Sequence, residues 1–293
     1  MKDIAYAAPT TIAEAVGLLN DKGDRARVLA GGTDLIVQVR EYRRDIDIMV
    51  DVKRVPEMME LRLDAKTGLT IGAAVPCYRI YDDPQIKKLY PGLVDAAYLI
   101  GGIQIQSRAS LGGNLCNSSP AADSIPALIA LEAVAVIAGP KATREVPVEQ
   151  FCQAPGKNVL ARGELLTAIR IPAPKPNSGA AYLRFIPRNE MDIAVVGVGV
   201  SVQLDVTKSK CVAARISLGA VAPTPLLVTE ASAALIGSTL IEDHLAKAAE
   251  LAQAAARPIT DMRGDAEYRK HLVSVLVKRT LNIAIDRAKG VNR

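Results

Sequence analysis

The chain has 293 residues, of which 49% are hydrophobic and 23% charged, so it can bury the core of one large or two ordinary domains. No apolar run approaches the length of a transmembrane helix, and the N-terminal stretch, with acidic Asp3 and no long apolar segment, does not resemble a signal peptide. We therefore expect no membrane span and a cytoplasmic location. The net charge of +5 is mild and scattered, and the chain has no Trp and only two Phe, which argues against nucleic-acid binding by base stacking. The excess of Lys and Arg over Asp and Glu is typical of an ordinary protein surface; the alternative is a docking face for an acidic partner subunit.

Cysteine and histidine are too sparse to predict a metal centre. The four cysteines are widely separated and form no CxxC pair, so neither a zinc site nor an iron–sulfur cluster has its usual spacing. We interpret them as buried apolar thiols in a reducing compartment. The two histidines, His244 and His271, lie in strongly helical sequence, so a histidine-based triad is not supported.

Short apolar runs alternate with helical spacing of apolar residues in the first part of the chain. Such spacing begins after Thr10 or Thr11, which predicts a helix there, and runs rich in β-branched residues predict strands. A hairpin is expected around the turn Lys66-Thr67-Gly68. The expected elements in order are a first helix from residue 12, a strand at 27–30, a helix at 34–42, a strand at 46–52, hairpin strands at 60–63 and 69–75, a helix at 85–100, an irregular stretch at 101–120, a helix at 123–131 and a strand at 133–137.

The stretch from Pro172 to Gly179 is the clearest domain boundary, because three prolines in five positions preclude a helix and leave few backbone donors for a sheet. Beyond it we expect strands at 181–186, 194–204 and 211–221, followed by helices at 225–236, 241–256 and 266–288. Strands followed by helices indicate an α+β domain. The predicted domains are 1–175, with lobes of about 1–55 and 56–175, and a C-terminal domain at 179–290.

The first glycine-rich element is the run from Val28 to Leu35, in which Gly31 and Gly32 follow a strand and precede a helix. Glycine lets a ligand approach the backbone closely, and the backbone N–H groups of such a turn can bind phosphate. A plain strand–turn–helix with Thr33 or Asp34 as the helix cap would have the same sequence.

The second element runs from Ser110 to Asp123 and is dense in small hydrogen-bonding residues inside an apolar neighbourhood. A loop so long and polar within a compact domain is typical of a binding loop. The alternative is a polar surface loop whose last residue, Asp123, caps the next helix.

Two common nucleotide-binding motifs are missing from the sequence. No GxGxxG follows a strand, since Gly197 and Gly199 sit inside an apolar strand pattern without the third glycine, and no GxxxxGK[ST] occurs. A Rossmann fold is therefore disfavoured and a P-loop excluded. A dinucleotide could still bind through a pair of separated glycine-rich elements.

With that pair in place, the sequence resembles the FAD-binding (medium) subunits of the xanthine dehydrogenase and carbon monoxide dehydrogenase family of molybdenum hydroxylases. The resemblance spans essentially the whole chain, and its most specific part is the middle run. It is carried by residues 30–35 (AGGTDL), 70–73 (TIGA), 100–105 (IGGIQI), 111–114 (LGGN), 119–123 (SPAAD), 164–166 (ELL), 169–172 (IRIP), 182–192 and 261–269 (DMRGDAEYR).

The resemblance implies a fold and a set of FAD contacts. The fold would be a vanillyl-alcohol-oxidase-type (PCMH-type) FAD-binding domain of two lobes, plus a small C-terminal domain of a three-stranded sheet and helices. Arg184 departs from relatives that commonly carry Lys at this cofactor-facing position, and Arg is longer and fork-shaped. Arg188 and Asp192 would lie in the flavin-side segment. The remaining implied contacts are the pyrophosphate loop Leu29, Ala30, Gly31, Gly32, Thr33 and Asp34; the phosphate and ribityl contacts Ser110, Gly112, Gly113, Asn114 and Asn117; Asp123 near the adenosine ribose; Leu166 at the adenine; and Ile100 near the flavin ring.

The same resemblance implies an electron-transfer role without catalytic or metal-ligating residues in this chain. A large molybdopterin subunit would hydroxylate the substrate, and a small subunit with two [2Fe–2S] clusters would pass electrons through FAD to an external acceptor, in a dimer of heterotrimers. One alternative is a stand-alone flavoprotein oxidase or reductase, for which Tyr78, Glu190 and Asp192 are acid–base candidates. Another is a non-catalytic assembly or cofactor-binding protein.

Overall fold

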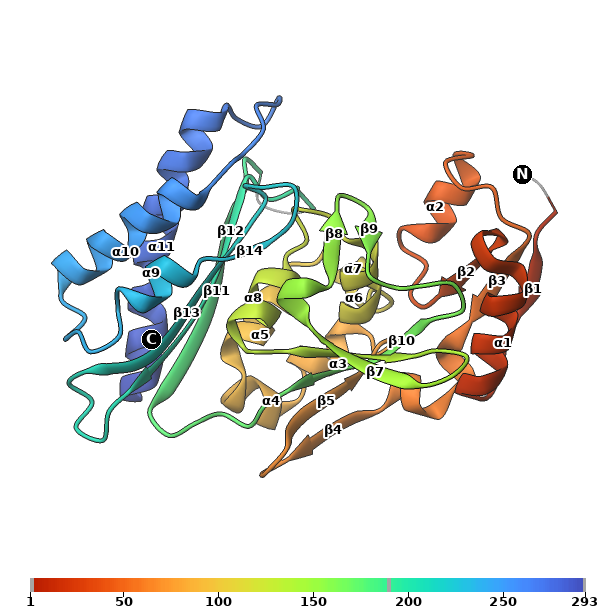
Figure 1. The fold of residues 1–293 in the computed structure, drawn as a ribbon, viewed down its shortest axis with the longest axis horizontal. Coiled ribbons are helices and arrows are strands. Elements are labelled where there is room, and N and C mark those ends of the chain that lie inside the picture. The colour runs from red at the N-terminus through yellow and green to blue at the C-terminus, as the bar shows by residue number, and fades with distance from the viewer. Residues whose placement is uncertain (1–2, 189–190, 292–293) are drawn as a thin grey trace.

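The computed structural model describes residues 3–188 and 191–291 (Figure 1). Along the long axis of the molecule lie an N-terminal lobe, a central lobe built on an antiparallel sheet, and a C-terminal sheet backed by long helices (Figure 1). None of the helices in these ranges is both long and apolar enough to cross a membrane.

The N-terminal lobe is a parallel sheet with two helices. Strands β1 (Ala5–Ala7), β3 (Ile48–Asp51) and β2 (Ala26–Leu29) lie side by side in that order, with helices α1 (Ile12–Lys22) and α2 (Leu35–Arg40) between them in sequence. The Thr11 side chain accepts a hydrogen bond from the Glu14 N–H, and the Glu14 carboxylate accepts one from the Thr10 N–H at 2.9 Å. This reciprocal capping confirms the predicted start of the first helix. Single 3₁₀ turns follow α1 and β3: η1 (Gly23–Arg25), η2 (Val52–Arg54) and η3 (Pro56–Met59).

The central lobe is an antiparallel sheet covered by short helices. Its strand order is β4 (Leu61–Asp64), β5 (Gly68–Gly72), β10 (Leu165–Ile171), β6 (Val134–Ala138), β7 (Thr143–Pro147). The late strand β10 inserts between β5 and β6, so the 56–175 segment closes on itself. A short turn η4 (Val148–Gln150) leads into a small hairpin of β8 (Cys152–Ala154) and β9 (Lys157–Asn158). The helices are α3 (Cys77–Tyr81), α4 (Pro84–Leu89), α5 (Pro91–Ala97), α6 (Ile103–Gln106), α7 (Leu111–Asn117) and α8 (Ser124–Ala130).

Two expectations for this lobe are wrong. The single helix predicted at 85–100 is broken into α4 and α5 at Tyr90–Pro91, because proline has no N–H to continue a helix and starts a new one instead. The stretch predicted to be irregular at 101–120 contains α6 and α7. The first half of the second glycine-rich element is thus helical, with Ser110 as the N-cap of α7.

The C-terminal part is a sheet between two sets of helices. Strands β11 (Ser178–Phe185), β12 (Val196–Leu204), β13 (Cys211–Gly219) and β14 (Leu226–Leu227) pair antiparallel in that order. The short β14 makes this a four-stranded sheet in the described residues, not the predicted three, and it replaces the start of the helix predicted at 225–236. The helices α9 (Thr229–Ala233), α10 (Glu242–Ala255) and α11 (Ala266–Lys289) follow it.

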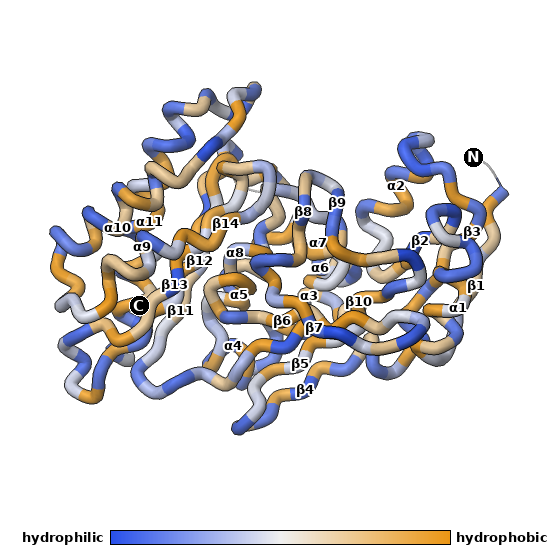
Figure 2. Tube along the Cα trace, in the orientation of Figure 1, coloured by the Kyte–Doolittle hydropathy of each residue, from blue (hydrophilic) through white to orange (hydrophobic). Residues whose placement is uncertain are grey.

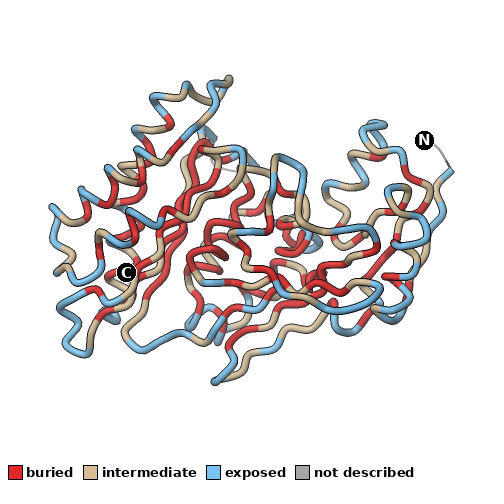
Figure 3. The backbone as a smooth tube through the Cα atoms, viewed as in Figure 1, coloured by how far each residue is buried: buried red, intermediate tan, exposed pale blue. Residues whose placement is uncertain are grey.

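Glycines let this sheet approach helices on both faces. A Cβ at Gly199 would lie 2.4 Å from the Pro126 carbonyl oxygen in α8, and a Cβ at Gly179 would lie 2.2 Å from the Ala284 oxygen in α11. The glycines in the β12 pattern therefore serve packing. The first 171 residues and residues 181–288 each have their own main apolar core, and apolar and buried stretches coincide along β12 and β13 (Figures 2 and 3).

Polar contacts tie the C-terminal part to the central lobe. The Asp95 carboxylate on α5 accepts hydrogen bonds from the Arg287 guanidinium on α11 at 2.6 and 3.0 Å, and from the Tyr182 backbone N–H at 3.1 Å. Arg287 also donates to the Ala180 carbonyl at 2.7 Å. A charge-assisted, two-pronged ion pair of this kind fixes orientation as well as distance.

Candidate functional site

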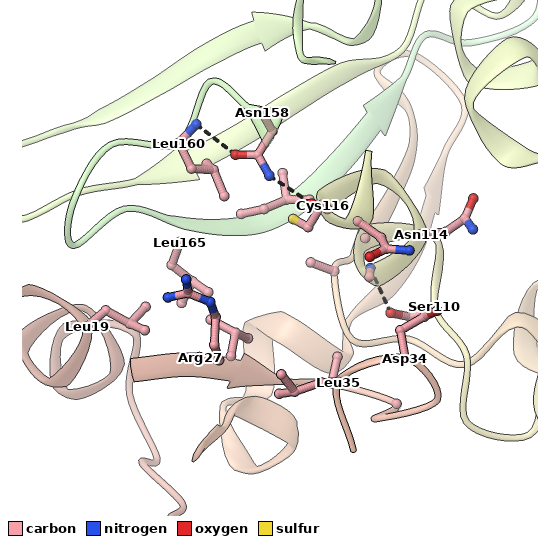
Figure 4. Close-up of a pocket in the computed structure, with 18 of the residues that line it drawn as sticks. Leu19, Arg27, Asp34, Leu35, Ser110, Asn114, Cys116, Asn158, Leu160 and Leu165 are labelled. Atoms are coloured by element: carbon pink, nitrogen blue, oxygen red, sulfur yellow. Dashed lines mark hydrogen bonds between the residues drawn. The ribbon is translucent and has the colours of Figure 1, made fainter. Parts of the chain in front are cut away.

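A cleft with a volume of about 660 Å³ lies between the N-terminal and central lobes (Figure 4). This volume is in the range of cavities that hold organic cofactors. Walls of the cleft come from the first glycine-rich element, α7, β10 and the loop after β9. Of the predicted site residues, those that line the cleft are Ala30, Gly31, Gly32, Thr33, Asp34, Ile100, Ser110, Gly112, Gly113, Asn114, Asn117 and Leu166.

The first glycine-rich element presents bare backbone to the cleft. A Cβ at Gly31 would lie 2.2 Å from the Arg108 carbonyl oxygen, and Gly32 has a φ of +80° that other residues rarely adopt. Among the described residues, no acceptor takes the backbone N–H of Gly32, Thr33 or Asp34. Asp34 occupies the N-cap position of α2, but its side chain makes no capping hydrogen bond. The turn therefore leaves its amide donors available to a ligand.

Helix α7 forms the opposite wall. The Ser110 hydroxyl caps the helix by accepting from the Gly113 N–H at 3.1 Å. Gly112 faces the protein, since its Cβ would lie 2.4 Å from the Ala73 carbonyl oxygen. Beyond the backbone of α7 itself, a Cβ at Gly113 would have within 4 Å just one atom of the described residues, the Ser110 Oγ at 3.1 Å. Because the Asn114 Oδ1 accepts from the Ser124 hydroxyl at 2.6 Å, its amide nitrogen is left to donate.

The loop at 156–164 builds the other end of the cleft, and no sequence motif predicts it. Asn158 in β9 donates to the Cys116 carbonyl at 2.8 Å and accepts from the Leu160 N–H at 3.0 Å, which brings the 156–164 loop against α7. In Figure 4, Arg27 and Leu165 lie at this end, and Asp34, Ser110 and Asn114 lie at the opposite end. No motif marks Asn158, because its role depends on a contact with a distant helix.

Three predicted site residues, Leu29, Asp123 and Arg184, do not line the cleft. Leu29 is buried beneath Gly32. Asp123 and Arg184 form a buried ion pair at 2.7 Å between the start of α8 and β11, where Asp123 also accepts from the Tyr182 hydroxyl at 2.8 Å. Burial raises the pKa of Asp123 to about 6, although the Arg184 charge and the Tyr182 hydroxyl act in the opposite direction. Asp123 does not cap α8 through its side chain.

Two known sequence families match the chain. One, described as the FAD binding domain in molybdopterin dehydrogenase, matches residues 2–174, and the other, described as the CO dehydrogenase flavoprotein C-terminal domain, matches residues 181–284. The chain belongs to the FAD-binding medium subunits of the xanthine and carbon monoxide dehydrogenase family. The predicted family and fold class are thereby confirmed, and this medium subunit is the flavoprotein component of an oxidoreductase.

Individual relatives agree over their full length. The carbon monoxide dehydrogenase medium chain of Afipia carboxidovorans is 35% identical over 97% of this chain and 98% of its own. The putative xanthine dehydrogenase FAD-binding subunit of Escherichia coli K12 is 31% identical over 98% of this chain and 97% of its own. Among solved structures, a chain of reconstituted CO dehydrogenase from Oligotropha carboxidovorans superposes with a TM-score of 0.93 at 32% identity, covering 98% of this chain and 99% of that one.

The residues of the medium subunit fit FAD. The pyrophosphate of FAD is anionic, and the cleft offers unused backbone N–H donors beside glycines whose Cβ atoms would fill the approach. Apart from these donors, the buried Nε of Arg184 has no hydrogen-bond partner in the described part of the chain. A buried donor without a protein partner needs a water or a ligand as its acceptor, although Arg184 itself does not line the cleft.

The acid–base candidates of a stand-alone oxidase find no support in this geometry. Tyr78 is exposed on α3, and Glu190 lies outside the described residues. Asp192 pairs with Arg188 at 3.3 Å, and the hydrogen bond from Arg188 lowers its pKa. Neither Tyr78 nor Asp192 lines the cleft. No group of three or more potential metal-ligating side chains occurs among the described residues.

Proposed function

We propose that this medium subunit relays electrons within a molybdenum hydroxylase, from the [2Fe–2S] clusters of a small partner subunit to an external acceptor. A large partner subunit with the molybdopterin cofactor would activate the substrate. When bound, FAD supplies the carrier that accepts and releases the electrons. The single observation that carries this proposal is a dinucleotide-sized cleft rich in backbone donors and without a paired acid and base.

The two glycine-rich elements would hold FAD from opposite sides. We propose that Ala30 to Asp34 and the start of α7 donate to the pyrophosphate, and that Asn114 and Asn117 donate to the phosphate and ribityl oxygens. Leu166, with its apolar neighbours Leu19 and Leu165 in the cleft, would contact the adenine. Fixed donors of this kind cost no reorganisation on binding.

Asp123 and Arg184 would act at the border between the cleft and the C-terminal part. Their ion pair leaves the Arg184 Nε unpaired, and that donor is what supports a contact with FAD. Because Arg184 already pairs with Asp123, we propose that Asp123 orients Arg184 for this contact.

Glu164 and Asp34, two of the three carboxylates that line the cleft, argue against independent substrate chemistry. Glu164 is engaged by Arg144 at 2.8 and 2.7 Å, and this contact lowers its pKa, so it stays ionised and occupied. Burial raises the pKa of Asp34, but no described side chain donates to it. A general base needs a positioned partner and a substrate proton within reach.

The separation of the two main cores and the boundary between the family matches, at 174 and 181, support the proposed domains at 1–175 and 179–290. The assembly we propose is a dimer of heterotrimers in the cytoplasm. Its stoichiometry is measured by light scattering of the co-purified subunits, and a 1:1:1 complex that does not dimerise would refute it.

The function is tested by purifying the chain alone and with its small and large partners. We expect one FAD per isolated chain, a flavin spectrum without iron–sulfur bands, and reduction by substrate only after both partners are added. A chain that binds no FAD contradicts the proposal. Substrate-dependent reduction of the isolated chain would instead favour the stand-alone flavoprotein.

A further inference from the structure

We propose that Lys53 and Arg108 are positioning residues for the phosphates of FAD, and that they act through the backbone of the first glycine-rich element without touching the ligand. This inference rests on the proposed role of Ala30–Asp34 as the pyrophosphate loop. Neither Lys53 nor Arg108 lines the cleft, whereas Ala30, Gly31 and Gly32 do.

Lys53 holds the first peptide group of the turn. Its Nζ donates to the Ala30 carbonyl oxygen at 2.9 Å and to the Asp51 carboxylate at 2.7 Å. Asp51 is buried at the end of β3 and also accepts from the Lys53 N–H at 3.0 Å and from the Tyr6 hydroxyl at 2.7 Å. The ammonium group is thus fixed to the sheet of the N-terminal lobe.

Arg108 holds the next peptide group from the other lobe. Its Nε donates to the Gly31 carbonyl oxygen at 3.0 Å. Its own carbonyl oxygen packs so close to the Gly31 Cα that no Cβ fits between them. Arg108 lies two residues before Ser110, the cap of α7, so it joins the two glycine-rich walls of the cleft.

The direction of these two bonds determines where the amide donors point. In a planar trans peptide the N–H and the C=O point in opposite directions. A cation that holds the Ala30 carbonyl therefore directs the Gly31 N–H the other way, and a cation on the Gly31 carbonyl does the same for the Gly32 N–H. The Gly32 N–H has no acceptor among the described residues.

The two cations also strengthen these donors. A cation that is hydrogen-bonded to a carbonyl oxygen polarises the peptide group, and consecutive hydrogen bonds strengthen one another. Adjacent glycines give the backbone unusual freedom. Fixing the carbonyls of Ala30 and Gly31 in the free protein therefore reduces the entropy lost when phosphate binds. Both effects act on the phosphates alone and not on the flavin ring.

The test compares ligands with and without phosphate. Lys53→Met and Arg108→Met keep the apolar bulk of each side chain and remove the charged donor. The matched control is Arg79→Met, because Arg79 donates to the Met59 carbonyl at 3.0 Å, a similar bond outside the glycine turn. Dissociation constants of the flavin-free chain are measured for FAD, for riboflavin, which has no phosphate, and for ADP, which has both phosphates and no flavin.

We expect Lys53→Met and Arg108→Met each to weaken the binding of FAD and of ADP by a common factor of about ten or more, the value of one charge-assisted hydrogen bond. Riboflavin affinity should stay within about two-fold, Arg79→Met should resemble the wild type, and Lys53→Arg should restore most of the FAD affinity. Equal losses for FAD and riboflavin, or unchanged FAD and ADP binding, would overturn the inference. If the wild-type chain itself binds no FAD, it is the proposed function that fails.

Discussion

Replacing Gly113 with leucine should impair FAD binding without destabilising the fold. Beyond the backbone of α7 itself, the Ser110 Oγ at 3.1 Å is the one atom of the described residues within 4 Å of a Cβ at Gly113, so the new side chain should extend into the cleft. Helix propensity improves by about 0.8 kcal/mol when a glycine in a helix is replaced, which offsets the tight contact with Ser110. The variant should therefore fold with a stability close to that of the wild type.

Its affinity for FAD should fall sharply. A leucine at this position keeps the pyrophosphate away from the nearby amide donors, and two charge-assisted hydrogen bonds at about 1.5–3 kcal/mol each correspond to a loss of about 10²- to 10⁴-fold. The assay is the flavin-to-protein absorbance ratio after desalting, with FAD titration of the flavin-free chain and its thermal unfolding.

The matched comparison is Gly112→Ala against Gly113→Ala. Each adds one methyl group in the same turn of α7, but only the Cβ at Gly112 would lie 2.4 Å from a backbone oxygen, so only that variant should unfold at a markedly lower temperature. The assignment is refuted if Gly113→Leu retains stoichiometric FAD, or if the two alanine variants lose stability equally.

Three further outcomes are expected. Gly31→Ala should reduce FAD retention at least ten-fold, because the new Cβ would lie 2.2 Å from the Arg108 carbonyl oxygen. Gly17→Ala, whose Cβ would meet nothing within 4 Å, should leave FAD retention unchanged. Equal flavin content in the two purified variants would contradict this expectation. Asp95→Asn should lower the free energy of unfolding by about 2 kcal/mol, because it breaks the partly buried pair with Arg287. The control Glu250→Gln, at the exposed pair with Lys247, should lower it by less than about 1 kcal/mol. Similar losses for the two variants in denaturant titrations would argue against the interdomain role of Asp95. Burial raises the pKa of Asp123 from its ordinary 3.8 to about 6, so the folded chain binds more protons between these values and its stability falls as pH rises from about 3 to 7, by roughly 3 kcal/mol. Asp123→Asn should remove that slope, and parallel stability–pH curves for the two proteins would show that Asp123 does not titrate there.

Most elements with strong periodicity could be predicted from the sequence, and the failures have identifiable causes. The long helices α10 and α11 carry a clear apolar face, and strands β10 and β12 are rich in β-branched residues. The sequence does not predict helix α7, because Gly112 and Gly113 have low intrinsic helix propensity. Tertiary contacts compensate for it, since Ser110 caps the helix and Gly112 packs against the Ala73 backbone.

The cleft could be predicted only where a local pattern marks it. Glycine turns have such a pattern, because their backbone geometry demands glycine itself. The 156–164 loop has none, since its place in the cleft depends on the Asn158 bond to the Cys116 carbonyl, across 42 positions of sequence. Lys53 and Arg108 are invisible for the same reason, because a lysine or arginine that binds a distant carbonyl looks like a surface charge.

Asp123 and Arg184 illustrate what a family resemblance transfers and what it does not. The resemblance implies that both residues lie near FAD. Their contact with each other follows instead from how closely β11 and β12 approach α8. That approach depends on Gly199, whose Cβ would collide with the Pro126 carbonyl, and on the Tyr182 hydroxyl that reaches Asp123. A lysine at this position would offer a shorter side chain with one terminal ammonium group, whereas the Arg184 guanidinium binds Asp123 and still has an Nε without a partner among the described residues. Arg184→Lys should therefore weaken the pair with Asp123 and, if the proposed contact of the Nε with FAD is correct, should also lower FAD affinity in a titration of the flavin-free chain.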